Sequence, residues 1–212
     1  HAPAYAVYNA VPMATYDFQP DVPPDAPLTF LGRIEPIKGT HVAIEVARQA
    51  GRDLVIAGNV AEEHEAYFSE RIQPEVDGNQ IRYVGTVNDA EKNEMLGASA
   101  AFLMPIDWEE PLGLVMAEAM ACGTPVVGLR RGAVEEVVDH GTTGFVCDTV
   151  DEMVAAVRRI DAIDRADCRT RCEDRFSQTA LVDAYERVYR TRIAALRSSL
   201  TTTAWPAPTF VW

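Results

Sequence analysis

One stretch of the chain indicates its fold: Glu109-Glu110-Pro111-Leu112-Gly113-Leu114-Val115-Met116-Ala117-Glu118-Ala119-Met120-Ala121-Cys122-Gly123-Thr124-Pro125-Val126-Val127. Pro111 and Gly113 predict a turn, and the residues after it are good helix formers. Gly123 is suited to end the helix, and the β-branched residues that follow predict a strand. A turn, a helix and then a strand is the repeating pattern of an α/β protein.

The start of this helix is suited to bind an anion. Gly113 leaves the first helical amides open to close approach, and a helix N-terminus carries unpaired N–H donors and a partial positive charge. Glu110 precedes the helix and Glu118 lies two turns inside it. A carboxylate can accept hydrogen bonds from vicinal hydroxyls, as on a ribose or a sugar ring. A phosphate flanked by two polyols describes a nucleotide sugar.

Short apolar segments alternate with helical ones along the rest of the chain. Strands are expected over residues 28–32, 53–58, 80–84, 100–104, 126–128 and 144–147. Further helices are expected over residues 40–50, 62–76, 89–97, 133–139, 151–160, 165–175 and 177–200. This alternation predicts a doubly wound, Rossmann-like parallel sheet covered on both faces. In such sheets ligands bind at the carboxyl ends of the strands, where Gly32, Gly58, Gly85 and the loop after residue 104 lie.

Composition limits the function. The chain has 212 residues and a net charge of −13 without a basic block, which argues against nucleic acid as the main partner. No apolar run approaches the ~20 residues of an integral membrane span. The four cysteines have no zinc-type spacing and predict buried thiols in a reducing, cytoplasmic setting. A metal or redox pair at Cys168 and Cys172 stays open.

The chain divides into a lead-in over residues 1–27, a domain over 28–175, a C-terminal helix over 176–200 and a tail over 201–212. The lead-in contains six of the thirteen prolines, and Tyr5–Val11 is expected to be a short strand or a linker. The tail is either a loosely held terminus or an aromatic strip that docks onto another domain or chain.

Two cations follow the first expected strand, in Gly32-Arg33-Ile34-Glu35-Pro36-Ile37-Lys38-Gly39. Arg33 offers a planar fork for two phosphate oxygens, and Lys38 adds a point charge, although both residue types are also common on surfaces. The chain lacks G-x-G-x-x-G, the P-loop pattern and Asp-x-Asp. A NAD site, a P-loop and a metal-bridged diphosphate therefore lack their usual support.

These motifs together resemble glycosyltransferase family 4, whose members are retaining enzymes with the GT-B fold. The resemblance rests on Gly-Arg-x-x-x-x-Lys-Gly, on the Glu110–Glu118 spacing with Glu-Ala-Met-Ala-Cys-Gly-Thr-Pro-Val-Val, and on the segment from Arg131 to Phe145. It runs from about residue 8 to 192 and covers only the C-terminal, donor-binding half of that fold. The resemblance implies an N-terminal acceptor domain, in the same chain or a separate one.

The resemblance also assigns roles to residues. Arg33 and Lys38, after Gly32, would bind the donor diphosphate, Glu110 the transferred sugar and Glu118 the ribose. The remaining donor contacts would come from the backbone amides of Gly113, Leu114 and Val115 and, for the base, from main chain near Tyr83 and Val84. The family often has Phe where Leu112 stands, which alters the shape of the sugar pocket.

The sequence therefore predicts the donor domain of a retaining glycosyltransferase that uses a UDP-sugar, an unidentified acceptor and no other cofactor or metal. The alternative is a non-catalytic nucleotide-sugar-binding module, or a subunit completed by a separate acceptor-domain chain. A sugar epimerase would need acid/base residues that the sequence does not offer.

Overall fold

The computed structural model describes residues 4–202, with side chains described up to residue 197. Its centre is a parallel sheet of six strands in the order β3-β2-β1-β4-β5-β6. The strands are β1 (Leu28–Leu31), β2 (Leu54–Ala57), β3 (Ile81–Tyr83), β4 (Ala101–Met104), β5 (Val126–Leu129) and β6 (Gly144–Cys147). This is the Rossmann strand order, so the predicted fold class is confirmed.

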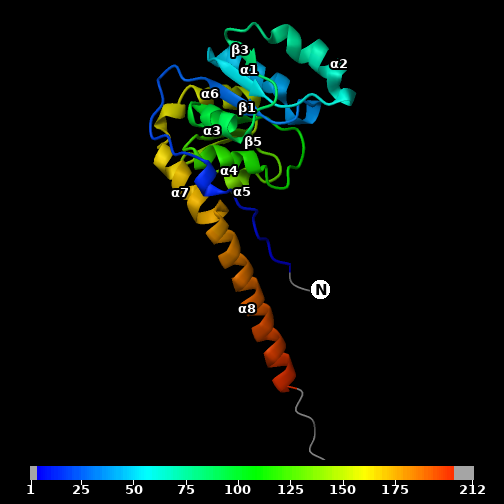
Figure 1. Ribbon diagram of the computed structural model, residues 1–212, viewed down its shortest axis with the longest axis vertical. Coiled ribbons are helices and arrows are strands. Elements are labelled where there is room, and N and C mark those ends of the chain that lie inside the picture. Colours follow the sequence, from blue (N-terminus) through cyan, green and yellow to red (C-terminus); the bar gives the residue numbers. More distant parts are fainter. Residues whose placement is uncertain (1–3, 203–212) are drawn as a thin grey trace, which may run out of the picture.

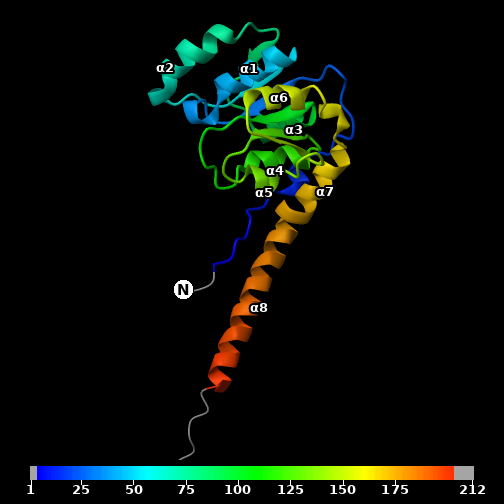
Figure 2. The same ribbon diagram turned by 180° about the vertical axis from the view of Figure 1, so that it is seen from behind.

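Helices cover both faces of the sheet (Figures 1 and 2). They are α1 (Thr40–Ala50), α2 (Glu65–Tyr67), α3 (Asp89–Gly97), α4 (Leu114–Ala121), α5 (Val134–Val137), α6 (Val150–Val157), α7 (Arg165–Phe176) and α8 (Gln178–Thr202). α1 packs against α6, whereas α4 packs against α3 and α7. The strands lie between these layers, which explains why they are apolar throughout.

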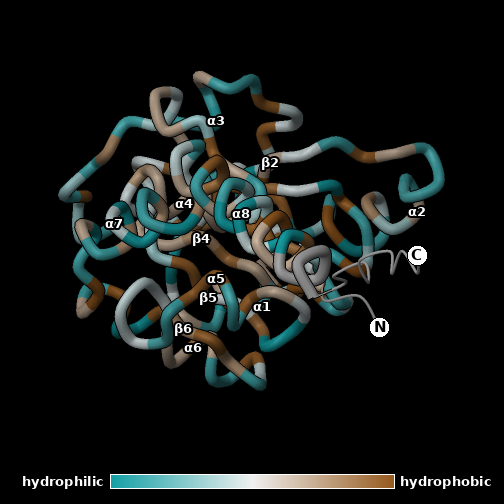
Figure 3. The backbone as a smooth tube through the Cα atoms, turned by 90° about the horizontal axis from the view of Figure 1, so that it is seen from below, coloured by the Kyte–Doolittle hydropathy of each residue, from teal (hydrophilic) through white to brown (hydrophobic). Residues whose placement is uncertain are grey.

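The core follows from this layering. All four residues of β2, β4 and β6 are buried, and Phe102 of β4 is among the largest fully buried side chains. Figure 3 shows the hydrophobic segments gathered at the strands, with hydrophilic segments in the outer loops. No helix in the described part of the chain is long and apolar enough to cross a membrane.

Three expected elements differ from the structure. Residues 62–76 do not form one continuous α-helix. A 3-10 turn comes first, followed by α2, the π-helical stretch Phe68–Ile72 and a second 3-10 turn. Pro74 lacks an amide proton and cannot extend an α-helical ladder. The helix expected over 133–139 is only the four residues of α5. Tyr5–Val11 forms no strand, and only Val11 makes an isolated bridge, to Ser177.

The lead-in lies against the domain, since Val11, Tyr16 and Ala26 are buried in its core. At the other end, Ser177 caps α8 by accepting a hydrogen bond from the Ala180 amide. α8 projects away from the sheet (Figure 1). The aromatic residues of the tail, about which two interpretations stay open, lie outside the described residues.

Candidate functional site

The two loops that leave β1 and β4 define the site. These strands are neighbours at the middle of the sheet, where the strand order reverses, and ligands of such sheets bind at the carboxyl ends there. A cavity of about 360 Å³ opens at this point. Eight of the predicted site residues line it: Gly32, Arg33, Lys38, Glu110, Gly113, Leu114, Val115 and Glu118. Tertiary structure therefore brings most of the predicted donor residues together.

Close backbone packing holds the two loops against each other. A Cβ on Gly39 would collide with the carbonyl oxygen of Pro105, which follows β4, and Gly39 has a φ of 75°. The Asp107 amide donates to the Ile37 carbonyl oxygen at 2.8 Å. Only glycine tolerates both this backbone conformation and this proximity, so Gly39 fixes the position of Lys38 beside the loop of Glu110.

Gly132, which follows β5, supports the Glu110 backbone from the other side. A Cβ there would collide with the backbone nitrogen and oxygen of Glu110. The Glu110 carbonyl accepts from the Ala133 amide at 2.9 Å, and the Glu109 carboxylate accepts from the Gly132 amide at 2.8 Å. These contacts give the Arg131-Gly132 segment a structural role beside the site.

Arg33 is oriented by a buried carboxylate. Its Nη2 lies 2.9 Å from Glu35 Oε1 in an ion pair that lacks hydrogen-bond alignment. Glu35 is buried, while the Arg33 side chain is 62% exposed. His64 Nε2 lies 3.3 Å from the other Glu35 oxygen. One guanidinium nitrogen of Arg33 is thus paired with Glu35, and much of the side chain stays exposed beside the cavity.

Lys38 and Glu110 form the second ion pair of the site. Lys38 Nζ donates to Glu110 Oε2 at 2.6 Å, and the two side chains are only 16% and 15% exposed. The Lys38 ammonium also lies 4.7 Å from the centroid of the Trp108 ring. The predicted phosphate cation is thus bound to the predicted sugar carboxylate.

The start of α4 has the open geometry that the sequence predicts. Gly113 precedes the helix with a φ of 64°, and no side chain caps the helix start. A Cβ on Gly113 would lie 2.8 Å from Met116 Cε and 3.0 Å from Met104 Cε. The amides of Leu114 and Val115 therefore face the cavity side of α4 without an intrahelical acceptor.

Glu118 is held by two donors that sequence reasoning missed. Tyr16 Oη donates to Glu118 Oε1 at 2.7 Å, and Lys92 Nζ donates to the same oxygen at 2.9 Å. Burial and the Glu118 carboxylate raise the pKa of Tyr16, so its hydroxyl stays protonated. Burial alone would lower the pKa of Lys92, but the adjacent Tyr16 and Glu118 raise it above its ordinary value. Lys92 is therefore a cation at neutral pH.

Each cation around the cavity has a carboxylate partner. Arg33 pairs with Glu35 and Lys38 with Glu110. Lys92 pairs with Glu118 and also with Asp89, at 3.4 Å. Lys92 could have been anticipated, because α3 starts at the carboxyl edge of the sheet, where Asn88 caps it in a capping box with Glu91. Tyr16 lies in the proline-rich lead-in, where the sequence offers no signal of a role at the site.

Tyr83 and Val84 do not line this cavity. The Tyr83 hydroxyl donates to the Gly58 carbonyl at 2.8 Å, and its ring packs against Phe68. Val84 borders a second hollow of about 490 Å³.

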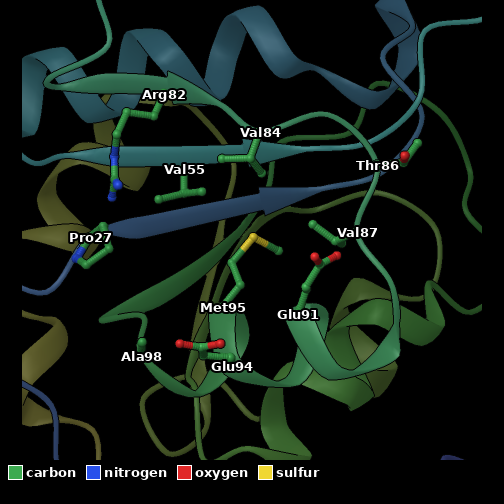
Figure 4. A pocket seen from close by; sticks show the side chains of 10 residues that line it. All are labelled: Pro27, Val55, Arg82, Val84, Thr86, Val87, Glu91, Glu94, Met95 and Ala98. Atoms are coloured by element: carbon green, nitrogen blue, oxygen red, sulfur yellow. The ribbon is translucent and has the colours of Figure 1, made fainter.

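Figure 4 shows the second hollow between strands β2 and β3 above and α3 below, with Met95 and Val55 at its middle. Arg82 is the one cation among its lining residues, and the carboxylates Glu91 and Glu94 lie on its α3 side. A diphosphate would meet more negative than positive charge there. The cavity beside β1 and β4 is therefore the better anion site.

The four cysteines are free and buried. Cys168 Sγ donates to the Thr143 carbonyl and Cys172 Sγ to the Ala117 carbonyl, so the two thiols have separate partners. Burial raises the pKa of each to about 12. These contacts favour a structural role over a redox role for both residues.

Comparison with known proteins agrees with this geometry. The model of the family "Glycosyl transferases group 1" matches residues 16–176. The lipopolysaccharide core biosynthesis glycosyltransferase LpsE of Rhizobium meliloti is 33% identical over 177 residues, which are 78% of this chain and 50% of that protein.

Two solved structures have the same fold. AviGT4, a glycosyltransferase involved in avilamycin A biosynthesis, superposes with a TM-score of 0.76 at 27% identity, covering 90% of this chain and 59% of that one. Anabaena HepE, in complex with UDP and glucose, superposes with a TM-score of 0.73 at 20% identity, covering 89% of this chain and 56% of that one.

The chain thus spans about half the length of the relatives it matches. Its sheet and covering helices are one Rossmann-like half of the GT-B fold that these glycosyltransferases share. On the extent of the family match, the chain belongs to the group 1 glycosyl transferases.

Proposed function

We propose that this chain is the donor-binding domain of a retaining glycosyltransferase that takes a nucleoside diphosphate sugar, with UDP as the nucleotide. The observation that carries the proposal is the single cavity at the carboxyl ends of β1 and β4. It combines three cations, two glutamates and the open amides at the start of α4. No other cavity described above combines these groups.

Each part of the donor has a matching group in this cavity. Arg33 and Lys38 would bind the diphosphate, and the amides of Leu114 and Val115 would bind its distal oxygens. Glu110 would accept hydrogen bonds from hydroxyls of the sugar. Lys38 is paired with Glu110, and in this proposal the donor phosphate takes Lys38 from that carboxylate.

The nucleoside would extend from Glu118 toward the neighbouring strands. Glu118 would bind the ribose diol, and the base would meet main chain near Tyr83 and Val84, at the carboxyl end of β3. That base contact stays a prediction, since Val84 borders the second hollow. UDP is the preferred nucleotide on the strength of the UDP-bound HepE structure, which shares this fold.

The proposed chemistry is departure of the nucleoside diphosphate from the anomeric carbon, with attack by an acceptor hydroxyl on the same face, whose proton passes to the departing phosphate oxygen. Negative charge grows on the leaving phosphate as this bond breaks. Arg33, Lys38 and the α4 amides are already fixed near that position, so they would lower the barrier electrostatically in place of a metal.

The buried thiols are consistent with a reducing, cytoplasmic setting.

An acceptor-binding domain would complete the active site, either in the same polypeptide or in a partner chain. The observation in favour is that the matched glycosyltransferases are about twice as long as this chain. The 212-residue chain alone is then expected to bind the nucleotide and to transfer little sugar, because the acceptor is not positioned. A non-catalytic nucleotide-sugar-binding module would show the same binding, and addition of an acceptor-domain chain would not restore transfer, whereas it would restore transfer by a subunit that such a chain completes.

Calorimetric titration with UDP, GDP, ADP and UDP-glucose tests the proposal. We expect UDP to bind, Lys38→Ala and Glu118→Ala to weaken it by at least tenfold, and Arg48→Ala to have no effect. Arg48 is a control because it pairs with Glu75 and Asp77 at the surface and does not line the cavity. The donor-site assignment is wrong if none of these nucleotides binds, or if Glu118→Ala binds UDP as tightly as the wild type does.

A further inference from the structure

Glu118 is a meeting point of three segments that are far apart in the sequence. It lies on α4, where its side chain is 13% exposed and borders the cavity. Tyr16 reaches it from the N-terminal segment that precedes β1, and Lys92 reaches it from α3. The side chain of Tyr16 is buried and does not line the cavity. Its hydroxyl reaches the ligand site through Glu118, and its ring contacts Lys92, which also lines the cavity.

The two donors occupy one oxygen of the carboxylate. An ionised carboxylate offers about four acceptor positions, two on each oxygen. Tyr16 Oη and Lys92 Nζ both donate to Oε1, at 2.7 and 2.9 Å, which fills its two positions. Among the described residues, Oε2 has no hydrogen-bond donor. Both positions on Oε2 are thus open to a ligand.

The N-terminal segment is itself held in place around Tyr16. The Tyr16 carbonyl accepts from Arg169 Nη1 of α7 at 2.9 Å, and the Asp17 amide donates to Asn93 Oδ1 of α3 at 2.9 Å. The Lys92 ammonium lies 5.4 Å from the centroid of the Tyr16 ring. Tyr16 is consequently a rigid donor, and Glu118 loses little further freedom when a ligand binds.

We propose that Tyr16 and Lys92 are positioning residues, which fix Glu118 through Oε1 so that Oε2 alone accepts the hydroxyls of the ribose. This inference rests on the proposed function, since it assumes a ribose at Glu118, and it adds two residues and one specific oxygen to that site. It also links the N-terminal segment to nucleotide affinity. A shift of Tyr16 would release Glu118 and weaken the hold on the ribose.

The test is calorimetry with UDP and with its 2′,3′-dideoxy analogue, on the wild type, Tyr16→Phe and Tyr8→Phe. Tyr8 is a matched control, because it lies in the same N-terminal segment and its hydroxyl also donates to a glutamate, Glu136, at 2.7 Å. That glutamate is not part of the cavity. We expect Tyr16→Phe to weaken UDP binding by about fivefold and to leave binding of the analogue unchanged. Tyr8→Phe should change neither.

The ratio of the affinity for UDP to the affinity for the dideoxy analogue separates positioning from a general structural role, because loss of structure would weaken the binding of both ligands alike. In a chain that carries Glu118→Ala, adding Tyr16→Phe should not change this ratio further. Lys92→Met is a second variant, in case Tyr16→Phe does not fold, and it should also lower the ratio. The inference fails if UDP binds, Glu118→Ala weakens it, and yet both positioning variants keep the wild-type ratio. If Glu118→Ala binds UDP normally, the proposed function itself fails.

Discussion

Replacing Glu110 by Gln is expected to have opposite effects on the stability of the unliganded protein and on its affinity for UDP. The change keeps the size of the side chain and removes its negative charge. Lys38 would then lack its carboxylate partner in a mostly buried position. The fold would lose stability, while Lys38 would become free to bind phosphate.

The geometry of the pair gives the expected magnitude. Two unit charges about 4 Å apart attract by about 4 kcal/mol at an effective dielectric constant of about 20, and desolvation offsets much of this. A hydrogen bond to a charged group contributes a net of about 1.5–3 kcal/mol, and Gln retains a neutral acceptor. The 2.6 Å contact is therefore expected to contribute about 1–2 kcal/mol to the free energy of unfolding. For a chain of this size, that corresponds to a fall in Tm of about 2–8 °C.

UDP binding to the wild type includes the cost of separating Lys38 from Glu110. Without that cost, we expect UDP to bind about tenfold more tightly to Glu110→Gln, which corresponds to about 1.4 kcal/mol. UDP-glucose should gain less than UDP, because the sugar loses its carboxylate acceptor. Urea unfolding measures the stability change, and calorimetry with the two ligands measures the affinities.

Glu75→Gln is the control for this experiment. Glu75 pairs with Arg48 at 3.0 Å, but both side chains are at least 40% exposed and far from the cavity. Exposed pairs of this kind contribute about 0–1 kcal/mol, so the control should change stability little and UDP affinity not at all. Unchanged or weaker UDP binding by Glu110→Gln would refute the idea that Lys38 changes partners when the donor binds.

Two further predictions concern the backbone and the thiols. Gly113→Ala should destabilise the protein by about 1–3 kcal/mol and weaken UDP binding, because a Cβ there would meet Met116 and Met104 at a φ of 64°. Gly51→Ala is the control, because Gly51 has a φ of 68° but open space around it. It should lower the free energy of unfolding in urea by only about 1 kcal/mol and leave UDP affinity unchanged. If the two variants changed UDP affinity equally, the role of Gly113 at the site would be contradicted. Burial raises the pKa of Cys122, Cys168 and Cys172 to about 12 and that of Cys147 to about 11. Iodoacetamide at pH 8 should therefore label the native protein very slowly. After unfolding, it should label all four cysteines. Rapid labelling of the native protein would show that a thiol is accessible and ionised.

Much of the fold could be predicted because its signals are local. Each apolar run bounded by glycine became a strand, and the helices expected over residues 40–50, 89–97 and 165–175 are α1, α3 and α7. The segment 62–76 was less predictable, because its α, 3-10 and π turns share one side-chain pattern and differ only in hydrogen bonding. The sequence left Tyr5–Val11 as a short strand or a linker, and in the structure only Val11 pairs with another segment.

The sequence by itself determined which residues stand at the carboxyl edge of the sheet. A parallel α/β sheet places every strand end on one edge, so Arg33, Lys38, Glu110 and Glu118 could be assigned to one site before any contact was known.

Tertiary structure decided how these residues pair. Lys38 meets Glu110 across 72 positions, and Tyr16 meets Glu118 across 102. Such contacts depend on how the loops and the N-terminal segment pack, and no local pattern encodes that packing. Only the folded chain therefore revealed that Glu110 and Glu118 each already have a cation as partner, and that one oxygen of Glu118 is left for a ligand.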